Sequence, residues 1–77
     1  MGEIELYGEV FDIELEGRTV YVRHPEWSLI GAGESLLEAE QDLVEECRDV
    51  RSALDAVPLS KLSPEALRMY EFALTVV

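Results

Sequence analysis

The chain has 77 residues and a mass of 8.7 kDa, which limits it to one small domain, residues 1–77, with a modest core. It carries 17 acidic and 6 basic residues, and its formal net charge is −11 at pH 7. Affinity for phosphate backbones and anionic lipids depends on Lys and Arg, so this balance argues against direct binding to nucleic acid or to membranes. A basic protein partner suits the charge better.

The single cysteine, Cys47, excludes an intramolecular disulfide and favours a reducing compartment. The sequence shows no long apolar run and no basic segment ahead of an apolar one. We therefore expect neither a membrane span nor a secretory signal, and we expect a cytoplasmic protein.

Residues 3–24 alternate in polarity and are rich in β-branched and aromatic side chains, which predicts a β-hairpin. A two-residue turn at Glu16 and Gly17 is natural because glycine tolerates the positive φ of tight turns. This turn would pair Phe11 with Val22 and place the apolar residues on one face of the sheet. Those residues are Phe11, Ile13, Val20 and Val22.

The segments on either side of the hairpin are less clear. Ile4 and Leu6 have the opposite parity from Phe11, so either Gly8 marks a β-bulge or the second face of the sheet is partly covered too. Residues 27–32 predict a third short strand. The glycines in residues 31–33 are interpreted as a flexible turn before a helix, with a phosphate-binding loop as the weaker alternative.

Two helices are expected in the remaining sequence. Ser35 and Glu38 form a capping box that begins a long helix, which we expect to end near Ala56. Its apolar positions recur at helical spacing and are Leu36, Ala39, Leu43, Cys47, Val50 and Leu54. Ser63 is the N-cap of a shorter helix over about residues 64–74. The apolar residues 73–77 leave a terminal strand as an alternative.

These elements predict an α+β fold. We expect a three-stranded antiparallel sheet with the long helix packed on one face, followed by a short C-terminal helix. Residues 58–77 contain as many basic as acidic residues, whereas the rest of the chain is strongly acidic. The neutral C-terminal segment therefore suits a docked or dimerising element.

Residues suited to catalysis or metal binding are few. His24 precedes a proline at a strand end, and no serine lies in a nucleophile-elbow context. Cys47 is interpreted as a small buried apolar residue, and one cysteine with one histidine cannot supply a zinc site. Asp12 and Glu14 share a strand face and could hold Mg²⁺, although a solvated face is the simpler interpretation. We expect no enzyme activity and no cofactor.

Four carboxylates recur along one face of the predicted long helix: Glu38, Asp42, Glu45 and Asp49. Like charges at this spacing destabilise a helix modestly, and no lysine is interleaved with them. The stripe is either a solvated outer face or a docking surface for a basic partner. Trp27 is the candidate apolar anchor for such a partner, and packing beneath the long helix is its alternative role.

The segments Val20–Trp27 and Gly31–Ala39 resemble the HicB-like antitoxin family. The matching positions are Pro25, Glu26, Gly33, Glu34, Ser35, Glu38 and Ala39. The chain departs from the family pattern at residues 28–30, where Ser-Leu-Ile replaces the usual Pro-Gly-Cys. Nothing in residues 58–77 resembles the DNA-binding module that is often fused to such domains.

The resemblance implies a partly degenerate RNase H-like domain, often oligomeric, that neutralises a small basic RNA-cleaving toxin of the HicA-like kind. We therefore expect a non-enzymatic, antitoxin-like protein-binding module. The alternative is a solitary self-associating domain with a housekeeping or ligand-binding role and no toxin partner. A homo-oligomer is expected in either case, from apolar residues placed off the helix-covered face and at the C-terminus. Those residues are Ile4, Leu6, Val10, Tyr21, Val76 and Val77.

Overall fold

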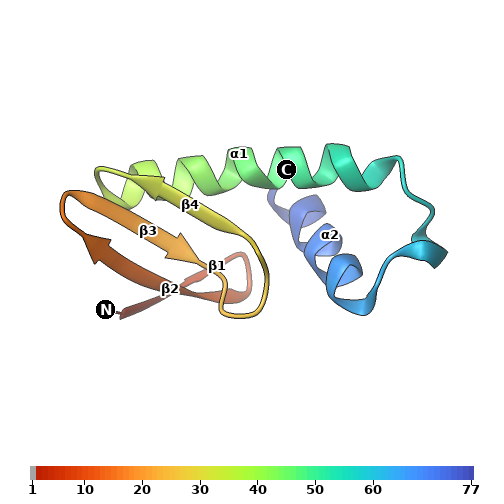
Figure 1. The fold of residues 1–77 in the computed structure, drawn as a ribbon, viewed down its shortest axis with the longest axis horizontal. Coiled ribbons are helices and arrows are strands. Elements are labelled where there is room, and N and C mark those ends of the chain that lie inside the picture. The colour runs from red at the N-terminus through yellow and green to blue at the C-terminus, as the bar shows by residue number, and fades with distance from the viewer. Residues whose placement is uncertain (1) are drawn as a thin grey trace.

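The computed structural model describes residues 2–77 and has an α+β fold (Figure 1). Four strands come first and form one antiparallel sheet in the order β1-β2-β3-β4. They are β1 (Gly2–Leu6), β2 (Glu9–Glu16), β3 (Thr19–Arg23) and β4 (Ile30–Gly33). The helical elements follow and are α1 (Leu36–Asp55), the 3₁₀-helix η1 (Leu59–Lys61) and α2 (Pro64–Val76). The expected long and short helices are confirmed, and residues 73–76 are helical.

The predicted three-stranded sheet is wrong by one strand, because β1 pairs along its whole length with β2. Tyr7 and Gly8 form the turn between them, with φ angles of 52° and 85°, as in a type I′ turn. Across a two-residue turn, each even-numbered residue pairs with an odd-numbered one, so Ile4 lies opposite Phe11. Ile4 and Leu6 therefore pack against the core, and the parity change needs no bulge.

The predicted register of the β2–β3 hairpin is wrong by two residues. Ile13 lies opposite Val22, and the turn consists of Gly17 and Arg18. Gly17 has a φ of 61° and takes the first turn position, where type II′ turns require glycine. A shift of two residues preserves parity, so the predicted apolar face is kept and Val22 is fully buried.

Helix α1 lies across this face of the sheet, over β4 and β3 (Figure 1). The backbones of α1 and β4 come so close that a Cβ added at Gly31 would lie 2.2 Å from the carbonyl oxygen of Ala39. At Gly33 it would lie 2.7 Å from the Ala39 backbone nitrogen. Both glycines belong to the strand, so their interpretation as a flexible turn is wrong. Their role is to let the helix approach the sheet.

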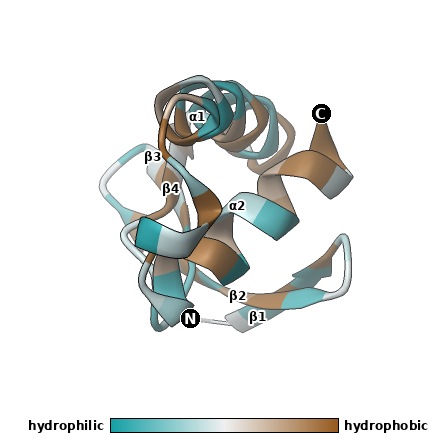
Figure 2. Cartoon of the chain, turned by 90° about the vertical axis from the view of Figure 1, so that its right-hand side faces the viewer, coloured by the Kyte–Doolittle hydropathy of each residue, from teal (hydrophilic) through white to brown (hydrophobic). Residues whose placement is uncertain are grey.

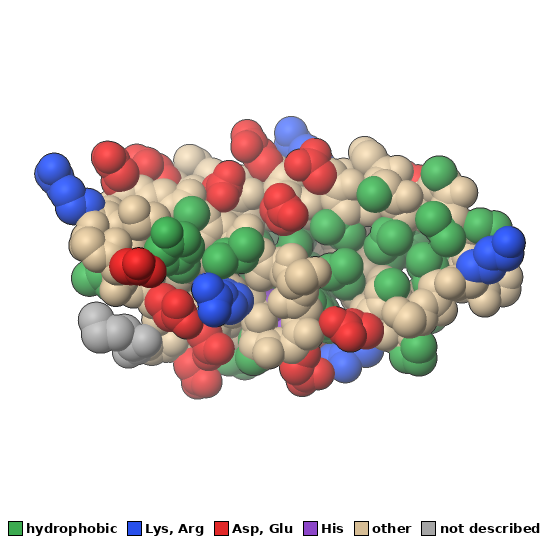
Figure 3. All heavy atoms as spheres, in the orientation of Figure 1, with side chains coloured by type: hydrophobic (Ala, Val, Ile, Leu, Met, Phe, Trp, Pro, Cys, Tyr) green, Lys and Arg blue, Asp and Glu red, His purple; other side chains and the backbone are tan. Residues whose placement is uncertain are grey.

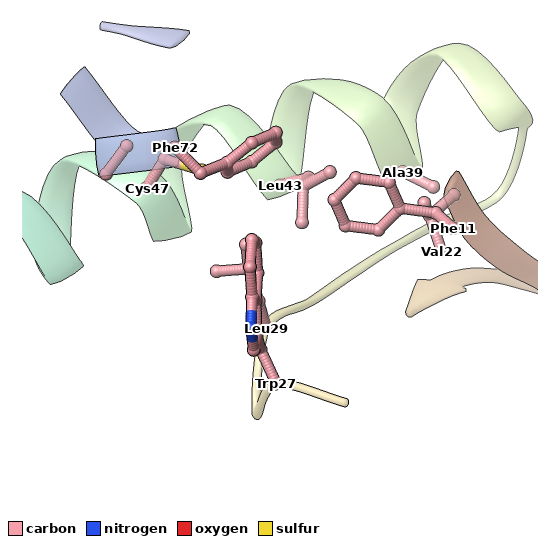
Figure 4. Close-up of a cluster of buried hydrophobic side chains, with 9 residues drawn as sticks. Phe11, Val22, Trp27, Leu29, Ala39, Leu43, Cys47 and Phe72 are labelled. Carbon is pink, nitrogen blue, oxygen red and sulfur yellow. The ribbon is translucent and has the colours of Figure 1, made fainter. Parts of the chain in front are cut away.

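The core fills the space between the sheet, α1 and α2. Figure 4 shows Phe11 pointing from β2 toward Leu43 of α1, with Phe72 of α2 beside them. The ring centres of Phe11 and Phe72 are 5.6 Å apart. Viewed along the long axis of the molecule, α2 lies between α1 and the β1–β2 hairpin (Figure 2). The C-terminal helix thus closes the core next to the β1–β2 hairpin, through the contacts of Phe72 with the rings of Tyr7 and Phe11.

Among residues 2–77, no helix has both the length and the apolar character needed to cross a bilayer.

We predict that Gly31→Ala destabilises the protein by about 1–3 kcal/mol, because the added methyl group overpacks the contact with Ala39. Elsewhere in an extended segment, the same change is neutral or slightly stabilising. Gly2→Ala is the matched control, since a Cβ at Gly2 meets no atom of the described residues beyond its chain neighbours within 4 Å. Equal free energies of unfolding for the two variants in urea would contradict the role given to Gly31.

Candidate functional site

The four carboxylates of the predicted stripe are all exposed on α1, but they divide into two pairs. Asp42 Oδ2 accepts a hydrogen bond from the backbone N–H of Ala32 at 2.9 Å, and Glu38 Oε1 accepts one from Glu34 at 3.2 Å. Ala32 belongs to β4, the last strand of the sheet, and Glu34 follows it. These two carboxylates therefore cover backbone donors that would otherwise lie open at a sheet edge.

The same contacts revise the predicted capping box. The Ser35 hydroxyl accepts a hydrogen bond from the Glu38 N–H at 3.2 Å, as expected for an N-cap. The Glu38 carboxylate, however, returns to the N–H of Glu34 and not to that of Ser35. The helix start is thereby tied to the end of β4.

Glu45 and Asp49 lie further along α1 and are exposed. Within residues 2–77, neither carboxylate makes a hydrogen bond or an ion pair. Figure 3 shows acidic side chains distributed along the outer side of α1. These two carboxylates are the part of the stripe that is free to meet another molecule.

The structure separates Trp27 from the acidic stripe. Its side chain is 5% exposed and belongs to the core. The indole stacks on the His24 ring, with ring centres 3.7 Å apart and planes 5° from parallel, and Phe72 packs against it at 5.6 Å. No group of residues 2–77 makes a hydrogen bond with the buried indole N–H. Trp27 thus packs mainly between the loop that joins β3 to β4 and helix α2. It presents almost no surface to a partner.

His24 organises the loop between β3 and β4. Its ring is buried, and Nδ1 accepts hydrogen bonds from the backbone N–H groups of Glu26 at 3.1 Å and Trp27 at 3.2 Å. Because Nδ1 accepts, the proton of the neutral ring lies on Nε2, which donates to Glu9 Oε1 at 2.9 Å. Both ring nitrogens are therefore engaged in holding the loop against β2.

Cys47 and Glu14 have environments that explain them without a catalytic role. Cys47 is fully buried in α1. Burial, together with the nearby charge of Glu46, raises the pKa of its thiol to about 11, so the thiol stays protonated at neutral pH. Glu14 lies 3.7 Å from Arg23 in an exposed ion pair. Residues 2–77 contain no group of three or more His, Cys, Asp or Glu side chains placed to hold a metal ion.

Two clefts flank the β1–β2 turn, and Tyr7 lines both. The first, which we call the α2 cleft, has a volume of about 250 Å³. It is lined by Tyr7, Glu9, Trp27, Arg68, Glu71, Phe72 and Thr75. The second is more apolar, has a volume of about 280 Å³ and has Cys47 among its lining residues. Neither cleft was predicted from the sequence, because each joins the first turn of the chain to its last helix.

Comparison of the chain with family models, curated proteins and solved structures found no significant match. The resemblance to the HicB-like family therefore stays a prediction that rests on the residues quoted for it.

The environment of Cys47 generates a pH prediction. A folded-state pKa of about 11, against an ordinary value of 9.0, means that the folded protein holds this proton more tightly than the unfolded chain. The contribution of the Cys47 thiol to the free energy of unfolding should therefore be fully present below pH 9. It should be lost as the pH rises toward 11. Urea unfolding across this window measures the effect. Cys47→Ala should reduce the fall of the unfolding free energy between pH 9 and 11, while lowering the stability at neutral pH. The same fall in the variant and the wild-type protein would contradict the raised pKa of Cys47.

Proposed function

We propose that the chain is a non-enzymatic module that binds a basic protein partner. The observation that carries this proposal is the pair of free carboxylates, Glu45 and Asp49, on the outer side of α1 in a chain of net charge −11. Acids that fulfil no role within the fold are available for complementary charge on another molecule.

The environments of His24 and Cys47 support a binding role over a catalytic one. The histidine uses both ring nitrogens within the fold. The cysteine is buried, with its pKa raised to about 11. General acid–base or nucleophilic catalysis needs a side chain that can reach a substrate in the correct protonation state. The residue types best suited to these tasks are occupied in holding the core together.

The partner that we propose is a small basic protein that acts on RNA, as the HicB-like resemblance implies. A surface that binds RNA carries basic residues for the phosphates, and a row of carboxylates can compete for the same residues. Exposed charge pairs contribute only about 0.2–1 kcal/mol each. The acidic face therefore steers and selects the partner, and tight binding needs an additional anchor.

A second candidate, self-association, is favoured by the distribution of apolar surface. Figure 3 shows hydrophobic side chains gathered at the end of the molecule where α1, η1 and α2 meet. Leu59 in η1 is 60% exposed, and it belongs to the segment of residues 58–77, which has zero net charge. Two copies of so acidic a chain would repel each other least at this end.

Reversing both Glu45 and Asp49 to Lys should slow association with the purified partner at low salt and flatten its dependence on ionic strength. The reason is that long-range attraction acts mainly on the association rate. The control is a double reversal of Glu16 and Glu3, two exposed acids on the sheet. An association rate that changes neither with the reversal of Glu45 and Asp49 nor with the salt concentration would contradict the proposed docking face.

For self-association, light scattering should return about twice the chain mass of 8.7 kDa at high protein concentration. Leu59→Lys should shift the protein to the monomer, because it places a charge in the apolar end. Leu15→Lys, at a residue that is 55% exposed on β2, is the matched control. A monomeric wild-type protein would overturn this candidate.

A further inference from the structure

The α2 cleft lies between the β1–β2 turn and one side of α2. Three of its lining residues are aromatic, Tyr7, Trp27 and Phe72, and two are acidic, Glu9 and Glu71. Aromatic faces and carboxylates both attract organic cations, and the attraction to an aromatic face is stronger where the cation is partly shielded from water. The volume of about 250 Å³ is below that of most sites for drug-sized ligands and suits a single side chain.

Tyr7 is held at the edge of this cleft in a costly conformation. Its φ of 52° lies in the left-handed region, where a bulky residue is unusual and where Asn, Asp or Gly would form the turn at lower cost. The side chain is nevertheless 55% exposed, and its ring meets Phe72 edge to face at 6.3 Å. An exposed aromatic ring kept in a strained turn is typical of a binding residue.

Arg68 shows how a guanidinium group fits against the residues that line the α2 cleft. Its terminal carbon lies 5.6 Å from the centre of the Trp27 ring, and its nitrogen lies 3.8 Å from Glu26 in an exposed ion pair. The chain thus already places one arginine at the aromatic part of the cleft. Glu9 uses Oε1 for the His24 contact, and its other oxygen and the Glu71 carboxylate are left for a second cation.

We propose that the α2 cleft receives an arginine or lysine side chain of the partner. This inference rests on the proposed function and supplies the anchor that the acidic face of α1 lacks. The cation would lie between the carboxylates of Glu9 and Glu71, and its aliphatic stem would pack on the exposed ring of Tyr7. Tyr7 therefore takes the anchoring role that the sequence assigned to Trp27.

The test uses N-acetyl-arginine-amide as the probe and the Trp27 indole N–H as the reporter, since Trp27 is the one tryptophan of the chain. Titration should shift this resonance in the ¹H–¹⁵N spectrum of the full chain, and N-acetyl-norleucine-amide should not. Glu71→Gln should weaken binding about two- to fivefold, and Tyr7→Asn by a similar factor through loss of the aromatic face. Arg68→Gln should strengthen it, because the resident cation is removed.

Glu16→Gln, at the far end of the sheet, is the matched control and should leave the titration unchanged. Glu71 and Arg68 are exposed, and asparagine suits the turn conformation of Tyr7, so all three variants should keep the fold. Equal shifts from the arginine and norleucine probes, or Glu71→Gln binding as tightly as the wild-type chain, would overturn the cleft assignment. These probe measurements need no partner, so they can fail while the reversal of Glu45 and Asp49 still supports the α1 docking face.

Discussion

The close contact between α1 and β4 is the constraint on which the other features depend. Side chains larger than hydrogen at Gly31 and Gly33 would push the helix away from the strand. The close approach buries Ala39 completely and brings the acidic side of α1 within hydrogen-bond reach of the edge of the sheet. The N-terminal half of α1 is thereby fixed against β4, and the second half continues toward α2 (Figure 1).

This packing gives the acidic stripe two different roles. Asp42 accepts a hydrogen bond from the backbone of β4, and Glu38 accepts one from Glu34, the residue that follows β4. Their charges also blunt a strand edge that could otherwise pair with another chain. Glu45 and Asp49 lie beyond the contact, and their charges are directed to solvent. A uniform pattern in the sequence is therefore part structural and part available for recognition, and the proposed function depends on the second part alone.

Local signals in the sequence predicted local structure well. Ser35 and Ser63 mark both helix starts, and each hydroxyl accepts the expected backbone hydrogen bond. Parity predicted the buried face of the hairpin, because a register shift of two residues leaves parity unchanged. The register itself depended on the turn type at Gly17, which a single glycine does not specify.

Features formed by distant residues could not be predicted in the same way. The role of Gly31 depends on Ala39 and Leu43, which approach it only after the helix has packed. The His24 network joins β2 to the loop before β4, and the α2 cleft joins residues near both ends of the chain. The turn at Tyr7 and Gly8 was interpreted as a bulge or a covered second face, because a bulky residue such as tyrosine is unusual at the positive φ that this turn requires.

The central claim is that α1 closes the edge of the sheet with its own carboxylates. Hydrogen exchange at single amides tests this claim most directly. The Ala32 amide, on the edge strand, and the Glu34 amide, just after it, should exchange slowly because the carboxylates of Asp42 and Glu38 accept their hydrogen bonds. Asp42→Ala should accelerate exchange at Ala32, whereas Asp49→Ala should not. Exchange at Ala32 as fast as in the exposed turn at Gly17 and Arg18 would contradict the account.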